Sequence, residues 1–135
     1  MIGRLLAWLR PPVVPAASPS TGAVSPRDVG LYDAMLDGWF LNDSGELLKG
    51  FAITAQDTLL DVGCGGGKTT LAAARVVGAN GVVIGADISA PLSALATRRA
   101  AESGVENLAF RLADMQVDVV GAGEFDVVLS QFGVM

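Results

Sequence analysis

Short apolar runs recur through the second half of the chain, at residues 58–62, 81–87, 108–112 and 125–130. Each run is almost continuously hydrophobic and does not alternate with polar residues. Strands of this kind are buried on both faces, which is typical of parallel sheets covered by helices. The pattern therefore predicts an α/β fold with a mainly parallel sheet and helices on both faces.

Two helices are predicted between these strands. The first covers about residues 68–77 and is closed by Gly78. The second begins after Ser89, which can cap it, carries Pro91 in its first turn and ends at Gly104. Strand, helix, strand, helix and strand in this order predict consecutive β-α-β units.

The first part of the chain has a different character. Five of the six prolines fall between residues 11 and 26, so residues 1–28 are predicted to form an extended, mobile leader. Residues 29–55 are predicted to form a helical lead-in. One apolar helix face is predicted from Tyr32, Met35, Leu36, Trp39 and Phe40, and a short helix from Gly45 to Lys49.

Composition excludes several functions. The formal charge of −5 and the pI near 4.4 argue against binding to nucleic acid. The chain has no histidine, which excludes His-based triads and the usual zinc sites, so no metal site is predicted. With one cysteine no internal disulfide can form, and a cytoplasmic location is expected. Only five apolar residues separate Arg4 from Arg10, too few for a membrane span or a secretion signal.

The most informative motif follows the first strand. Asp61 ends an apolar run, and glycines follow at 63, 65 and 67 before the first predicted helix. Glycine allows positive φ and a close approach of a ligand to the backbone, and the helix start offers free N–H groups. Asp87 ends the second strand 20 positions beyond Gly67. An acid at this spacing is typical of a carboxylate that binds ribose hydroxyls.

Two common glycine-rich loops fit less well. A dinucleotide fingerprint starting at Gly63 or Gly65 would need its last glycine at Lys68 or Thr70. A phosphate-binding P-loop ending in Gly67 and Lys68 would need its first glycine at Val62. Asp61 would also place negative charge near a polyphosphate. A dehydrogenase stays open as a weaker alternative.

With its spaced glycines and strand-end acids, the chain resembles the class I S-adenosylmethionine-dependent methyltransferases over about residues 56–135. Phe125 to Val128 and Ser130 to Gly133 also resemble this family, in its ubiquinone/menaquinone-biosynthesis-like branch. The resemblance implies that the bend packs on the methionine part of the cofactor and that Asp87 binds the ribose. It implies that Ile88 lies beside the adenine and that Asp114 binds the adenine amino group. The implied cofactor-binding residues are Asp61, Gly63, Cys64, Gly65, Gly67, Asp87, Ile88, Asp114, Met115 and Ser130.

The resemblance implies S-adenosylmethionine as cofactor and methyl transfer to a small-molecule acceptor. No catalytic base can be assigned. Four predicted strands would make residues 56–135 the N-terminal, cofactor-binding half of such a domain, with an incomplete sheet. Strand four would then be an exposed edge through which the chain could self-associate. A degenerate adenosyl-binding or interaction module without catalysis is the alternative.

Overall fold

The computed structural model of the 135-residue chain describes Leu48 and residues 52–121 and 123–131. Its elements follow the order β1 (Thr58–Val62), α4 (Lys68–Val77), β2 (Val82–Asp87), α5 (Ala90–Ser103), β3 (Leu108–Leu112) and β4 (Val127–Leu129). The first five elements confirm the predicted alternation of strands and helices.

The four strands form one sheet in the order β3-β2-β1-β4, and every neighbouring pair is parallel. The predicted Rossmann-like parallel sheet is therefore confirmed. β1 lies between β2 and β4, and all five of its residues are buried. Because the chain leaves β3 at one side and re-enters at β4 on the other, the strand order reverses beside β1. Such a reversal opens a crevice at the carboxyl ends of the strands.

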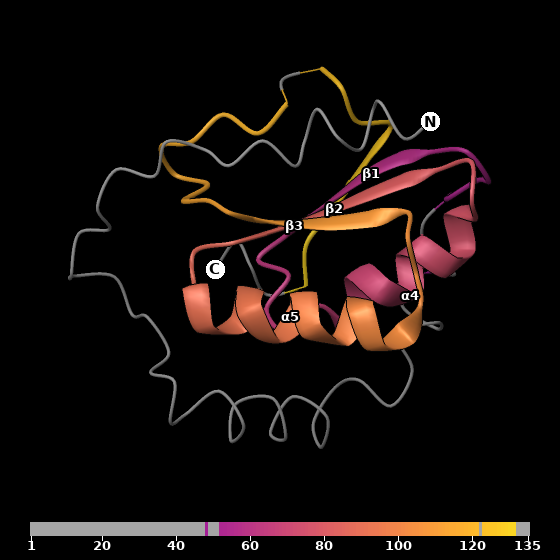
Figure 1. Cartoon of the computed structure of the whole chain (residues 1–135). Coiled ribbons are helices and arrows are strands. Elements are labelled where there is room, and N and C mark those ends of the chain that lie inside the picture. The colour runs from indigo at the N-terminus through magenta and orange to yellow at the C-terminus, as the bar shows by residue number, and fades with distance from the viewer. Residues whose placement is uncertain (1–47, 49–51, 122, 132–135) are drawn as a thin grey trace.

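The helices α4 and α5 lie on the same face of the sheet, below it in Figure 1. Both crossovers, β1 to β2 and β2 to β3, run in the same direction across the sheet. Since such crossovers are right-handed, both helices must cover the same face. Helical cover on the second face, which the sequence pattern also predicts, is not present among the described residues.

Two apolar cores fill the space on either side of the sheet. The core between α4 and the sheet contains Leu59, Val77 and Val83, all fully buried, and Leu48 packs into it. Leu48 is helical, and the other residues of the short helix predicted from Gly45 to Lys49 lie outside the described residues. The second core, on the other face, includes Ile84. The strands thus read as continuous apolar runs because alternate residues enter different cores.

β4 spans Val127 to Leu129 and is therefore shorter than the strand predicted over residues 125–130. At its start, the Asp126 carboxylate accepts a hydrogen bond from the Thr58 backbone N–H at 2.8 Å, where a ladder carbonyl would otherwise stand. Past its end, the Ser130 hydroxyl donates to the Val62 carbonyl at 2.8 Å. Side chains therefore complete the pairing of β4 with β1 at both ends.

The predicted leader (1–28) and most of the predicted lead-in (29–55), including its apolar helix face, lie outside the described residues. In the part of the chain that is described, no helix is both long enough and apolar enough to cross a bilayer.

Candidate functional site

Hydrogen bonds between main-chain atoms hold the bend between β1 and α4 in place. Gly63, Gly65 and Gly67 all have positive φ, at 68°, 53° and 79°. The N–H groups of Gly63 and Cys64 donate to the Ala86 carbonyl at 2.8 and 3.1 Å, and that of Gly67 donates to the Cys64 carbonyl at 3.0 Å. The bend is thereby attached to the end of β2.

Two of these glycines are needed for different reasons. A Cβ at Gly67 would lie 2.7 Å from Phe110 Cζ and 2.8 Å from Ala96 Cβ, so the bend packs tightly on its inner side. A Cβ at Gly65 would meet nothing within 4 Å. The backbone at Gly65 therefore borders open space, as a ligand cradle requires.

Asp87 organises the bend from the end of β2. Its Oδ2 accepts a hydrogen bond from the Gly65 N–H and its Oδ1 one from the Ser89 N–H, both at 2.8 Å. The side chain is largely buried, yet Asp87 lines the pocket described next. Each carboxylate oxygen has a second lone pair, so Asp87 can also accept hydrogen bonds from a ligand.

A pocket of about 250 Å³ lies at the carboxyl ends of the strands. It combines backbone and apolar surface with two carboxylic acids and two amides. The residues that line it are Val62, Gly63, Ala86, Asp87, Ile88, Ala113, Asp114, Met115, Gln116 and Gln131. None of these described residues is lysine or arginine. Two carboxylates without a cation suit hydroxyl, amino or cationic groups, and would repel a pyrophosphate.

Asp114 reaches the pocket because a hydrogen bond joins the carboxyl end of β3 to that of β2. The Ala113 N–H donates to the Asp87 carbonyl at 2.9 Å, which brings the two strand-end acids to the same edge. Asp114 Oδ1 accepts a hydrogen bond from the Gln116 N–H at 3.0 Å. Ile88 and Met115 also line the pocket, although 43% and 37% of their surfaces are exposed. Apolar side chains left exposed beside acids suit a flat, partly polar ligand group.

Asp61 does not line the pocket but lies beneath the bend. Its side chain points to the helix face of the sheet, where Oδ2 accepts a hydrogen bond from the Thr70 hydroxyl at 2.7 Å. Burial raises the pKa of Asp61 to about 7, the Thr70 hydrogen bond opposes this rise, and the nearby Asp87 charge adds to it. Through this hydrogen bond Asp61 connects the end of β1 to the first turn of α4.

Cys64 lies within the bend and Ser130 directly follows β4, and neither residue lines the pocket. Burial, with the charges of Asp61 and Asp87, raises the pKa of the Cys64 thiol well above its usual range. The thiol is therefore not activated as a nucleophile. Ser130 closes the junction of β4 with β1 through its bond to Val62.

Of the ten predicted site residues, five line the pocket: Gly63, Asp87, Ile88, Asp114 and Met115. Five further lining residues were not predicted: Val62, Ala86, Ala113, Gln116 and Gln131. Four of these flank a predicted residue at a strand end and could have been found from that position. Gln131 enters from β4, where its Oε1 accepts a hydrogen bond from the Thr69 hydroxyl at 3.1 Å.

Comparison with known families and proteins supports this reading of the fold. Residues 53–133 match the model of a family described as "Methyltransferase domain". Nocamycin O-methyltransferase of Saccharothrix syringae is 38% identical over 102 residues, which cover 76% of this chain and 36% of that protein. The chain thus spans about a third of the length of this relative.

Solved structures share the fold at lower identity. A SAM-dependent methyltransferase from Aquifex aeolicus has a TM-score of 0.67 at 22% identity, and the match covers 78% of this chain and 56% of that one. Coclaurine N-methyltransferase, solved with N-methylheliamine and SAH, has a TM-score of 0.58 at 24% identity, covering 73% of this chain and 26% of that one. At these identities the likeness concerns the fold.

Proposed function

Because the chain belongs to the methyltransferase domain family, we propose that it binds S-adenosylmethionine in the strand-end pocket and serves methyl transfer to a small-molecule acceptor. One observation carries the proposal. An open glycine bend adjoins a pocket whose two carboxylates, Asp87 and Asp114, come from the ends of neighbouring strands.

The residues fit the parts of this cofactor. Asp87, already fixed by two backbone N–H groups, would accept hydrogen bonds from the ribose hydroxyls. Ile88 and Met115 would contact the adenine, and Asp114 would accept from its amino group. The bend at Gly63 to Gly67 would hold the methionine part, since a side chain at Gly65 would occupy that space.

The cofactor, when bound, supplies an activated methyl group on a sulfonium. The contribution of the chain is to bind, orient and exclude water, which is the larger part of the task when the leaving group is already activated. The name of one similar protein, nocamycin O-methyltransferase, supports a small molecule as acceptor.

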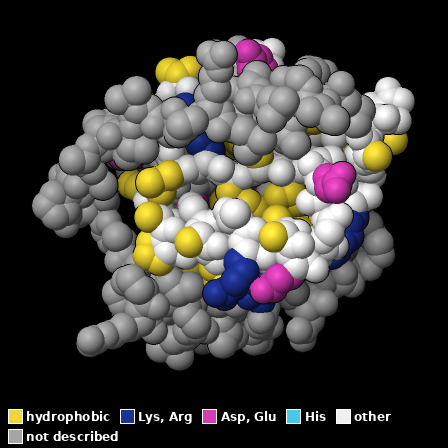
Figure 2. All heavy atoms as spheres, viewed as in Figure 1, with side chains coloured by type: hydrophobic (Ala, Val, Ile, Leu, Met, Phe, Trp, Pro, Cys, Tyr) yellow, Lys and Arg dark blue, Asp and Glu magenta, His cyan; other side chains and the backbone are white. Residues whose placement is uncertain are grey.

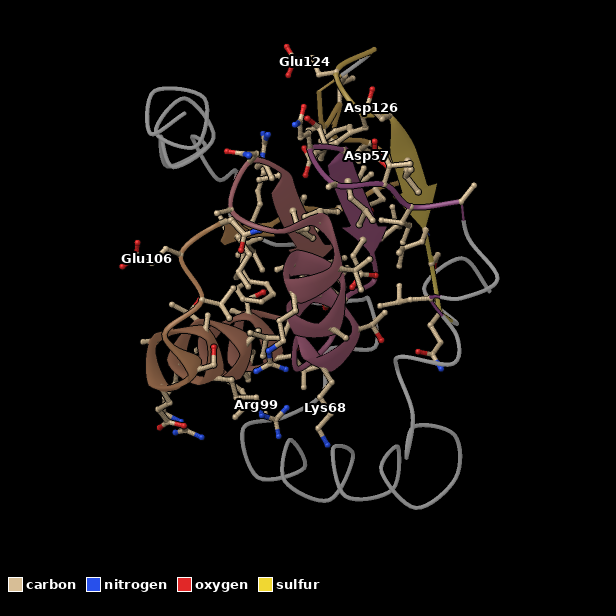
Figure 3. All side chains as sticks on the ribbon, turned by 90° about the vertical axis from the view of Figure 1, so that its right-hand side faces the viewer. Asp57, Lys68, Arg99, Glu106, Glu124 and Asp126 are labelled. Atoms are coloured by element: carbon tan, nitrogen blue, oxygen red, sulfur yellow. The ribbon has the colours of Figure 1, made fainter. Side chains whose placement is uncertain are left out.

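Calorimetry with S-adenosylmethionine and S-adenosylhomocysteine tests the proposal. We expect both to bind, and Asp87→Ala to weaken both by at least about 100-fold, because hydrogen bonds to a carboxylate are worth about 1.5–3 kcal/mol each. Glu124→Ala removes an exposed acid at the other end of the sheet (Figure 3) and should change neither affinity.

Two results would contradict the proposal. One is a folded protein that binds neither compound, and the other is NADH displacing S-adenosylhomocysteine, which would favour a dehydrogenase. Mass spectrometry of adenosyl compounds that co-purify with the protein offers an independent check.

A further inference from the structure

Arg99 reaches from the C-terminal half of α5 to the glycine bend, where its Nη1 donates to the Gly66 carbonyl at 3.0 Å. We propose that Arg99 is a positioning residue, which holds the bend in its ligand-ready form without lining the pocket. The inference rests on the proposed function, since it is the binding of S-adenosylmethionine that the bend would serve.

Three successive glycines are each held by a different contact. The Gly65 N–H is bound by Asp87, the Gly66 carbonyl by Arg99, and Gly67 packs on Ala96 and Phe110. Only the first of these contacts comes from a residue of the pocket. The bend is therefore clamped from the pocket side by β2 and from behind by α5 and β3.

The inner face of α5 is arranged for this contact. Ala96 and Arg99 are three residues apart, so they lie on the same side of the helix. Ala96 is small and fully buried, which lets α5 approach Gly67, and the longer Arg99 extends to the neighbouring carbonyl. Figure 3 shows Arg99 beside Lys68, the first residue of α4 after the bend.

A glycine-rich bend needs such an anchor. Glycine loses more conformational freedom on ordering than any other residue, and three consecutive glycines add this cost. Gly66 is buried, and among the described residues the Arg99 guanidinium is the hydrogen-bond donor to its carbonyl. A hydrogen bond from a charged donor is also stronger than one between neutral groups.

Because Arg99 is charged, two possible roles of its side chain predict different changes in ligand affinity when the charge is removed. If the guanidinium acted on the cofactor only by long-range electrostatics, removing it would strengthen binding of the cationic S-adenosylmethionine and leave the sulfur-neutral S-adenosylhomocysteine nearly unchanged. If it positions the bend, removing it weakens binding of both compounds by the same factor.

The experiment compares three variants of the purified protein by calorimetry. Arg99→Met keeps the apolar stem and removes the donor, and Arg99→Lys retains a charged donor. Arg98→Met removes the same charge from the exposed face of α5, where Arg98 Nε lies 3.9 Å from Glu102 Oε1. Figure 2 shows basic and acidic side chains together over α5 on the visible face. Hydrogen exchange of the Gly65 and Gly67 amides is measured without cofactor.

For Arg99→Met we expect both affinities to fall by about 5- to 30-fold, the equivalent of one or two kcal/mol. Arg99→Lys should recover part of this loss, and Arg98→Met should match the wild type. The two glycine amides should exchange faster in Arg99→Met alone. Unchanged exchange, or affinities equal to those of Arg98→Met, would overturn the inference. A wild type that binds neither compound would refute the proposed function, and the exchange result would still decide the role of Arg99 in the bend.

Discussion

Asp61 is an acid held in the interior of the protein, and its ionisation opposes folding. Its pKa is raised from 3.8 to about 7, chiefly by burial. Between these values the folded state binds the proton more tightly than the unfolded state does. The free energy of unfolding must therefore fall as the pH rises through this window, and the contribution is lost above about pH 7.

Asp61→Asn tests this effect, because the amide is neutral at every pH and its oxygen can still accept from Thr70. We expect the stability of the variant relative to the wild type to rise by up to about 4 kcal/mol between pH 4 and pH 7.5. Urea unfolding across this range measures the difference. A constant difference would mean that Asp61 ionises in the folded protein as easily as in the unfolded chain.

The position of Asp61 also shows where sequence reasoning reaches its limit. The motif marks the strand-end acids well, because parallel strands bring their carboxyl ends to one edge, and Asp87 and Asp114 do meet at the pocket. The face on which a side chain lies depends on strand parity. Asp61 shares the parity of Leu59 and therefore points under α4, toward Thr70.

Contacts between residues far apart in the chain could not be predicted from the sequence. Thr69 and Gln131 are 62 positions apart, and Gly66 and Arg99 are 33 apart. No local pattern reports such pairs, since they arise from the packing of helices on the sheet. By contrast, local signals such as the cap at Ser89 and the terminating glycines predicted the bounds of the helices correctly.

In the bend between β1 and α4, one glycine is needed mainly for stability and another mainly for ligand binding. Gly67→Ala would place a Cβ against Phe110 and Ala96 at positive φ, so we expect a loss of at least about 2 kcal/mol in the free energy of unfolding. Gly65→Ala meets no neighbour and should cost about 1 kcal/mol for its backbone alone.

The two variants should rank in the opposite order for ligand binding per folded molecule, since only the Gly65→Ala methyl enters the space proposed for the cofactor. Denaturant unfolding and calorimetry on the same samples measure both quantities. Equal binding by Gly65→Ala and the wild type would show that this space is not used.

Asp126 belongs to the pairing of β4 with β1 and not to the pocket. Asp126→Ala leaves the buried Thr58 N–H without its acceptor, so we expect a loss of about 1–2 kcal/mol and faster exchange of the Thr58 amide. Cofactor affinity should stay within about twofold. A much larger drop in affinity would give this carboxylate a role in the site that its contacts do not indicate.

The negative net charge of the chain should favour the cationic cofactor over its neutral-sulfur product. The chain carries a formal charge of −5, and the pocket holds two carboxylates. S-adenosylmethionine carries a positive sulfonium that S-adenosylhomocysteine lacks. Raising the salt concentration from about 0.05 to 0.5 M shortens the range of these interactions. It should therefore reduce the affinity for S-adenosylmethionine about threefold more than that for the product, as measured by calorimetry.

The reversal of strand order beside β1 places the proposed cofactor pocket at one end of the sheet. Every residue of the pocket lies at the carboxyl ends of the strands, whereas the turn between α4 and β2, with Ala79 and Asn80 exposed, lies at the opposite edge. The six residues of β2 span roughly 20 Å between the two. A fluorophore or an affinity handle attached at Ala79 would thus report on the protein, or immobilise it, while leaving the strand-end pocket unobstructed.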